Sequence, residues 1–129
     1  MSIYVDADIV VAWERGDLDL PLWIQENHPD DTLIFPPTVW QQLLFGQFAW
    51  VGARAQKRAR YLQAFGLPVS NFSASHASRA AQLTAELKHR TIGFADFQIA
   101  ACALVDSADL LTFNREHFTR VSGLRVITP

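Results

Sequence analysis

The sequence predicts an α/β fold in which a mainly parallel central sheet of four to five strands is flanked by helices. Short runs of β-branched and aromatic residues alternate along the chain with longer stretches of helical apolar spacing. Parallel strands need crossover connections, and the intervening helices would supply them. The 129 residues contain no internal repeat, low-complexity tract or linker, so we expect a single domain over residues 1–129.

The strands are expected where apolar runs end at turn-forming or polar residues. Pro68 suits an edge strand better than a central one, because proline cannot donate to the ladder of hydrogen bonds. The predicted strands are residues 3–5, 32–35, 67–69, 110–112 and 124–127.

The helices are expected where apolar residues recur every three or four positions. The most apolar of them, GFADFQIAACAL at residues 93–104, has Gln98 as its only polar residue after Asp96, so we expect it to be buried. It carries the single cysteine, Cys102, which can form no intrachain disulfide and suits a reducing compartment. The other helical stretches are residues 9–15, 17–28, 38–48, 49–65, 75–90 and 114–118.

Composition limits the possible functions. Half of the residues are hydrophobic, which excludes a disordered chain, and a net charge of −2 means that any basic surface for nucleic acid must be local. The first residues lack a basic segment and include Asp6 and Asp8, so they do not form a signal peptide, and no apolar run approaches the roughly 18 residues of a membrane span. We expect a soluble, cytoplasmic protein with no membrane contact.

Asp96 stands at the entrance of the apolar helix and has two interpretations. It can meet the unpaired N–H groups of the first helical turn, or it can bind a ligand. Asp6 follows the first strand and Asn114 follows the strand at 110–112, so the sheet should bring both toward Asp96. Carboxylates gathered in one place repel unless a cation intervenes, and Mg²⁺ or Mn²⁺ suits these oxygen ligands. Asp8 is expected to cap the first helix.

Three segments carry a resemblance to a known family. YVDADIVVA, GFADFQIAACAL and LLTFNREHFTRVSGLRVI resemble the opening strand, the third acidic motif and the closing motif of the PIN-domain family. Asp96 and Asn114 are eighteen positions apart (114 − 96), a spacing usual in that family. The resemblance covers nearly the whole chain, and the length is most similar to the VapC-type toxins of bacterial toxin-antitoxin pairs.

The resemblance implies a metal-dependent ribonuclease that cleaves RNA phosphodiesters with Mg²⁺ or Mn²⁺. Asp6, Asp96 and Asn114 match the metal-binding positions, with Asp8 as an accessory carboxylate, and Thr112 matches the hydroxyl that supports the last motif. The sequence departs from the family at the second acid. The usual Glu, four residues before a Gly, is replaced by Gln42, four before Gly46. An amide supplies an oxygen but no negative charge, so we expect weaker metal binding and slow turnover.

Positive charge is concentrated in the helix at 49–65. The basic residues of this helix form either a solvated face or a phosphate-binding surface for RNA. Arg115 and His117 follow Asn114 and could reach a phosphate, whereas His76, His89 and His117 lack the spacing of a metal site, and packing or surface roles are expected for them. The basic residues of the helix are Arg54, Lys57, Arg58 and Arg60.

Two alternatives to the nuclease remain open. A catalytically weakened or inactive PIN domain could serve as an RNA-binding module or as a protein-interaction module. The sequence contains four Trp and nine Phe, and several crowd one region, where they either pack in the core or form a homodimer face or an antitoxin groove. The resemblance itself implies both a homodimer and a small antitoxin partner. The crowded aromatic residues are Trp40, Phe45, Phe48 and Trp50.

Overall fold

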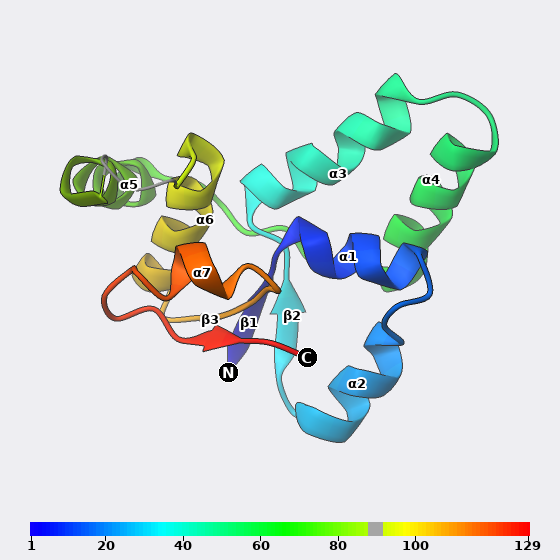
Figure 1. The fold of residues 1–129 in the computed structure, drawn as a ribbon, viewed down its shortest axis with the longest axis horizontal. Coiled ribbons are helices and arrows are strands. Elements are labelled where there is room, and N and C mark those ends of the chain that lie inside the picture. The colour runs from blue at the N-terminus through cyan, green and yellow to red at the C-terminus, as the bar shows by residue number, and fades with distance from the viewer. Residues whose placement is uncertain (88–91) are drawn as a thin grey trace.

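The computed structural model describes residues 1–87 and 92–129, and its centre is a parallel sheet in the order β2-β1-β3-β4 (Figure 1). The central strand β1 pairs with β2 through Ile3 and Leu33 and with β3 through Ile3 and Asp109. The predicted α/β class with four parallel strands is confirmed. The strands are β1 (Ser2–Val5), β2 (Thr32–Ile34), β3 (Asp109–Leu111) and β4 (Val126–Ile127).

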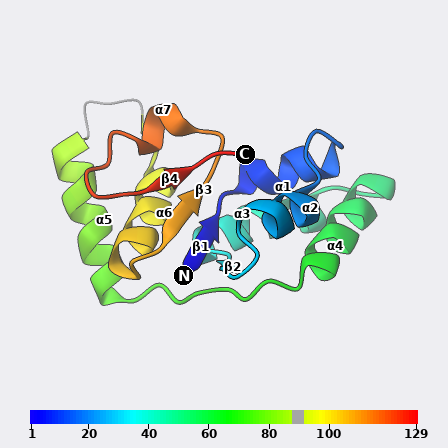
Figure 2. The same ribbon diagram turned by 90° about the horizontal axis from the view of Figure 1, so that it is seen from below.

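The helices supply the crossovers between these strands. Figure 2 shows α5 and α6 gathered at one end of the long axis and α2 and α4 at the other, with the sheet between them. Helix α5 packs on α6, and α3 packs on α4. The helices are α1 (Ala7–Glu14), α2 (Leu20–Asn27), α3 (Pro37–Ala49), α4 (Ala53–Phe65), α5 (Ala74–Leu87), α6 (Phe94–Val105) and α7 (Arg115–Phe118).

Helix α6 lies in the core, as its apolar sequence predicts. Phe97, Ile99 and the four residues from Ala100 to Ala103 are all buried. The small alanine side chains let the helix backbone approach its neighbours closely, and the Cys102 thiol is fully enclosed among them. Burying this helix fixes its first turn, which carries Asp96, at the edge of the sheet.

The prediction of a strand at residues 67–69 is wrong. These residues make a single parallel bridge between Val69 and Phe35, with Phe35 N donating to Pro68 O and Ser70 N donating to Phe35 O, both at 2.9 Å. Pro68 has no N–H to extend this pairing into a ladder. The segment therefore fastens β2 to the connection between α4 and α5 without adding a strand.

The crowded aromatic residues divide between core and surface. Trp40 is half-buried and stacks on Phe35 with ring centroids 5.7 Å apart, whereas Phe45 and Phe48 are 67% and 77% exposed. Trp50 is half-buried, with the guanidinium of Arg54 3.5 Å above its ring centroid. Of the helices that the structure describes, none is long and apolar enough to cross a membrane.

Candidate active site

Asp6 is placed by the junction of β1 and α1. It is the residue after the strand and the N-cap of the helix, and its Oδ1 accepts a hydrogen bond of 2.8 Å from the N–H of Ala7. Its side chain belongs to the buried polar residues, at 7% exposure. The strand end thus holds a carboxylate in a nearly dry position at the carboxyl edge of the sheet.

Thr112 joins Asp6 to the end of β3. Its buried hydroxyl donates to Oδ2 of Asp6 at 2.7 Å and accepts from the N–H of Asn114 at 3.0 Å. The same hydroxyl lies 3.3 Å from Oδ2 of Asp8. One fully buried oxygen therefore positions the first carboxylate and the start of the segment that carries Asn114.

Asp8 does not cap α1, because Asp6 occupies the N-cap and Asp8 lies in the first turn. Its side chain reaches across to the end of β3, where Oδ2 accepts from the N–H of Phe113 at 3.1 Å. Its other oxygen, Oδ1, is buried and has no hydrogen-bond partner among the described residues. A buried carboxylate oxygen without a donor is unfavourable unless a proton or a cation reaches it.

Asp96 and Asn114 meet at the side chain of His117. The ring nitrogen Nδ1 of His117 lies 3.0 Å from Oδ2 of Asp96 and 2.9 Å from the side-chain amide of Asn114. Asp96 lies in the first turn of α6, whose N-cap position is occupied by Gly93 with no side-chain cap, so Asp96 is not the N-cap. A protonated Nδ1 donates to the Asp96 carboxylate, and an unprotonated Nδ1 accepts from Nδ2 of Asn114, so the tautomer of His117 decides which of the two contacts is a hydrogen bond.

The electrostatics of the cluster disfavour three separate negative charges. Burial, followed by the nearby charge of Asp8, raises the pKa of Asp6 to about 6, against the lowering effect of the bonds from Thr112 and Ala7. Burial also raises the pKa of Asp8, and the charge of Asp96 adds to that increase. A bound cation would reverse both effects by favouring the charged carboxylates.

These residues fit a hard divalent cation by their chemistry. Asp6, Asp8 and Asp96 offer carboxylate oxygens, Asn114 offers an amide oxygen, and the unpartnered Oδ1 of Asp8 is a buried acceptor. Within residues 1–87 and 92–129, no group of three or more His, Cys, Asp or Glu side chains is arranged so that it could hold a metal ion by itself. Water or substrate phosphate would therefore have to complete the coordination, as Mg²⁺ commonly requires.

Gln42 is not joined to this cluster by any hydrogen bond in the described structure. It is exposed on α3 and lines a cleft between α3 and α6 together with Thr38 and Gln98. The structure therefore brings Asp6, Asp8, Thr112, Asp96 and Asn114 together and leaves Gln42 at an adjoining surface.

The expectation of an RNA-facing Arg58 requires correction. Its side chain is buried and forms a bidentate pair with Glu14, with Nε 2.6 Å from Oε2 and Nη2 2.8 Å from Oε1, while Nη1 donates to Leu43 O at 3.0 Å. The guanidinium is committed to joining α1, α3 and α4. Arg54, Lys57, Arg60 and Arg115 are exposed.

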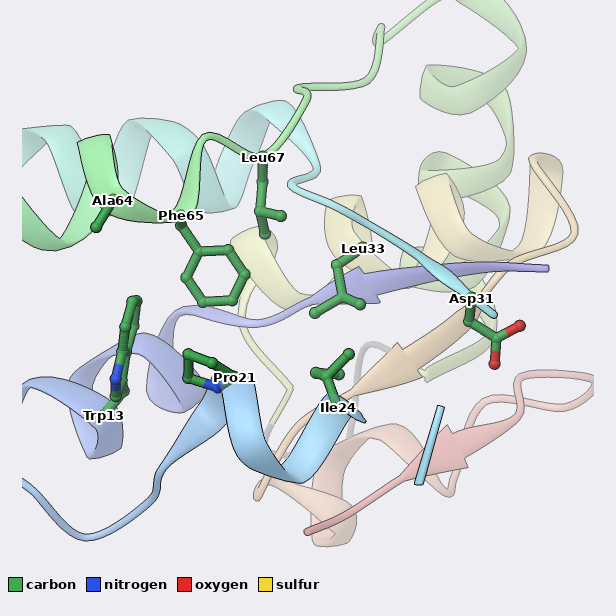
Figure 3. A pocket seen from close by; sticks show the side chains of 8 residues that line it. All are labelled: Trp13, Pro21, Ile24, Asp31, Leu33, Ala64, Phe65 and Leu67. Atoms are coloured by element: carbon green, nitrogen blue, oxygen red, sulfur yellow. The ribbon is translucent and has the colours of Figure 1, made fainter. Parts of the chain in front are cut away.

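A second hollow, of about 460 Å³, lies away from the acidic cluster between α1, α2, β2 and the end of α4 (Figure 3). Its walls are mostly apolar and include Trp13, Ile24 and Phe65. The carboxylate of Asp31 at its rim is held by His28 at 3.0 Å and by the N-terminal amine at 3.4 Å. This hollow lacks the convergent oxygen ligands that the sheet edge provides.

From the sequence, His117 was expected to be a surface or packing residue, with a phosphate contact as the alternative; its contacts with Asp96 and Asn114 were not predicted. The usable signal was its place three residues after Asn114, which on a helix brings two side chains to the same face. His76 is buried and bonded to Asp106 at 2.9 Å and to Ser73, in agreement with a packing role. His89 lies outside the described residues.

Known proteins are similar to this chain in sequence and in fold over nearly its whole length. Ribonuclease VapC1 of Rickettsia felis is 29% identical over 134 residues, covering 99% of this chain and 96% of that protein. VapBC2 from Rickettsia felis, bound to a DNA fragment from its promoter, has a similar fold with a TM-score of 0.86, 22% identity and coverage of 99% and 98% of the two chains. VapBC-1 from nontypeable Haemophilus influenzae has a TM-score of 0.84 at 21% identity, with the same coverage. The family model of the PIN domain matches residues 3–124, and the chain belongs to the PIN-domain family.

Proposed function

We propose that this protein is a metal-dependent endoribonuclease and the toxin component of a type II toxin-antitoxin pair, acting in the cytoplasm. The observation that carries the proposal is the buried carboxylate of Asp6 next to the half-buried Asp8, whose Oδ1 atom is buried and has no hydrogen-bond partner among the described residues. Two neighbouring carboxylates repel each other when both are charged, unless a cation lies between them. The PIN-domain family match and the ribonuclease relative support hydrolysis of RNA as the reaction.

The protein's residues would hold and orient the reacting groups. Asp6, Asp96 and Asn114 would hold Mg²⁺ or Mn²⁺, with Asp8 as an accessory ligand. When bound, the ion supplies an activated water and neutralises charge on the scissile phosphate. Thr112 keeps the Asp6 carboxylate in place, and His117 does the same for Asp96.

Gln42 would set the rate of the enzyme. Its amide cannot act as a base and adds no charge to hold the ion, so we expect slow cleavage that is better supported by Mn²⁺ than by Mg²⁺. Replacing Gln42 by Glu should increase both metal affinity and turnover. An unchanged rate in the Gln42→Glu variant would show that this position takes no part in the reaction.

The decisive experiment is an RNA cleavage assay of the purified protein in Mn²⁺, Mg²⁺ and EDTA. Asp96→Asn should abolish cleavage, whereas Asp17→Asn, at an exposed aspartate in the connection between α1 and α2, should leave it unchanged. Equal inertness of the wild type and Asp96→Asn across metals and RNA substrates would overturn the nuclease proposal.

A small antitoxin protein and a second copy of the chain are the proposed protein partners. The similar solved structures include VapBC complexes, which supports an antitoxin. The exposed Phe48 and Val51 near the end of α3 offer apolar area for one of these contacts. Co-expression with the product of the neighbouring gene should yield a stable complex, and light scattering of the chain alone should give twice its 14.5 kDa mass.

The second candidate function is RNA binding without cleavage. It is favoured by the exposed Arg54, Lys57 and Arg60 on α4, which do not need a metal to attract phosphate. RNA affinity that falls steeply with salt and is unchanged by EDTA, combined with no cleavage in any metal, would select this function over the nuclease.

A further inference from the structure

The cleft between α3 and α6 has a lining unlike that of the acidic cluster. It measures about 580 Å³. None of the described residues that line it is ionisable. The lining residues are Thr38, Gln41, Gln42, Phe45, Phe94, Ala95 and Gln98.

Its polar groups are primary amides, which both donate and accept hydrogen bonds. The hydroxyl of Thr38 donates to Oε1 of Gln98 at 2.9 Å, which fixes the orientation of that amide and leaves its Nε2 hydrogens for a ligand. Gln41 and Gln42 are exposed on the facing helix. A planar, uncharged ligand with donor and acceptor groups along its edge matches this lining better than a phosphate or a charged side chain.

The apolar part of the lining includes two aromatic rings that lie largely outside the hydrophobic core. Phe94 is 76% exposed and Phe45 is 67% exposed, so neither contributes much to the core. Exposed aromatic faces stack well on nucleobases, and proteins that read single-stranded RNA combine such stacking with hydrogen bonds to base edges. Phe94 also lies in the same turn of α6 as Asp96.

We propose that this cleft binds one unpaired nucleobase of the RNA substrate, next to the phosphate that the acidic cluster cleaves. The proposal rests on the proposed ribonuclease function and adds to it a base-binding subsite, with Phe94 as the stacking residue and Gln98 as the residue that reads the base edge. Gln42, in place of a metal-binding carboxylate, contributes to this recognition.

The test measures RNA binding by the full-length chain in EDTA, so that its outcome does not depend on cleavage. The probes are eight-nucleotide single-stranded RNAs, each intact or with one abasic nucleotide, read by fluorescence anisotropy. An abasic nucleotide at one position should weaken wild-type binding about tenfold, because the stacking and edge contacts of that base are lost. A 2-aminopurine at that position should also be quenched on binding.

Two variants and a matched control assign the effect to the cleft. Phe94→Ala and Gln98→Ala should bind intact and abasic RNA equally, and the 2-aminopurine signal should be lost in Phe94→Ala. Phe48→Ala removes a ring of nearly the same exposure, 77%, that does not line the cleft, and should keep the full abasic effect.

The outcomes separate this proposal from the nuclease. A wild type that binds abasic RNA more weakly than intact RNA but cleaves RNA in none of the metals would retain the subsite and overturn the nuclease. A wild type that cleaves RNA but binds intact and abasic RNA equally at every position would overturn the subsite alone. If Phe94→Ala weakens capture of the antitoxin and leaves the abasic effect unchanged, the cleft is a protein contact and the proposal is wrong.

Discussion

The hydroxyl of Thr112 donates a hydrogen bond of 2.7 Å to the carboxylate of Asp6, a residue 106 positions earlier in the chain. The two residues directly follow the neighbouring strands β1 and β3, and both are buried. This hydrogen bond is the link through which the two ends of the sequence share one site.

Replacing Thr112 by Val should therefore destabilise the protein. The change preserves the shape of the side chain but removes a donor to Asp6 and an acceptor for the N–H of Asn114, which would leave buried polar groups unpaired. We expect a loss of about 1–3 kcal/mol in the free energy of unfolding, measured by urea denaturation. Thr112→Ser keeps the hydroxyl and should retain most of that free energy.

Replacing Asp8 by Asn should stabilise the protein in the absence of metal. An Asn keeps an oxygen to accept from Phe113 N while it removes one of the charges that repel one another in the cluster. The gain should be roughly 1 kcal/mol, on the scale of ordinary single substitutions. Thermal melts should also show that Mn²⁺ raises the Tm of the wild type more than that of Asp8→Asn, whereas Asp17→Asn should respond as the wild type does.

Replacing Arg58 by Met should cost about 3 kcal/mol of stability, because Glu14, only 11% exposed, would keep its charge without a partner. The RNA-binding footprint should not change in the folded fraction. Arg60→Met is the control with the reverse behaviour, since Arg60 is exposed: the unfolding free energy should stay constant, and the salt dependence of RNA binding should weaken.

Gly46→Ala should be destabilising, although alanine is normally favoured over glycine within a helix. A Cβ at this position would come within 2.8 Å of Nη1 of Arg58 and of the Trp50 ring, and the hydrogen bonds of Arg58 prevent it from moving aside. A loss of about 1–3 kcal/mol is expected from overpacking. An increase in the denaturation midpoint would show that Arg58 and Trp50 repack easily.

The protein should lose stability as the pH rises from about 9 to about 12. Burial raises the pKa of Cys102 from 9.0 to about 12, with a contribution from the charge of Asp106, and burial with the bond to Asp106 raises that of Tyr4 from 10.0 to about 12. Both groups are held neutral in the folded chain, so unfolding releases protons and becomes more favourable as the pH increases through this window. Urea denaturation at pH 8 and pH 10.5 measures the effect, and Cys102→Ala should reduce it.

The sequence was sufficient to predict the four strands to within two residues at each end, and the approach of Asp6, Asp96 and Asn114 to one another, because parallel strands and crossover helices leave few arrangements. The pairing of Arg58 with Glu14 was not predictable, since it joins positions 44 apart on different helices. The contact of His117 with Asp96 was not predictable for a related reason: α7 has only four residues, too few for a periodic pattern to show which side chains share a face. The segment 67–69 forms only a single bridge at Val69, but its sequence resembles that of a strand, because isolated bridges and strands use the same β-branched residues.

The bond between Thr112 and Asp6 also has a consequence for protein synthesis. Asp6 and Asp8 are translated more than a hundred residues before the groups that hold them in place, Thr112 and the N–H of Phe113. A nascent chain that stops before β3 therefore lacks the geometry of the site, whatever part of it has already folded. The assembled site would exist only after β3 and the residues that directly follow it have been translated.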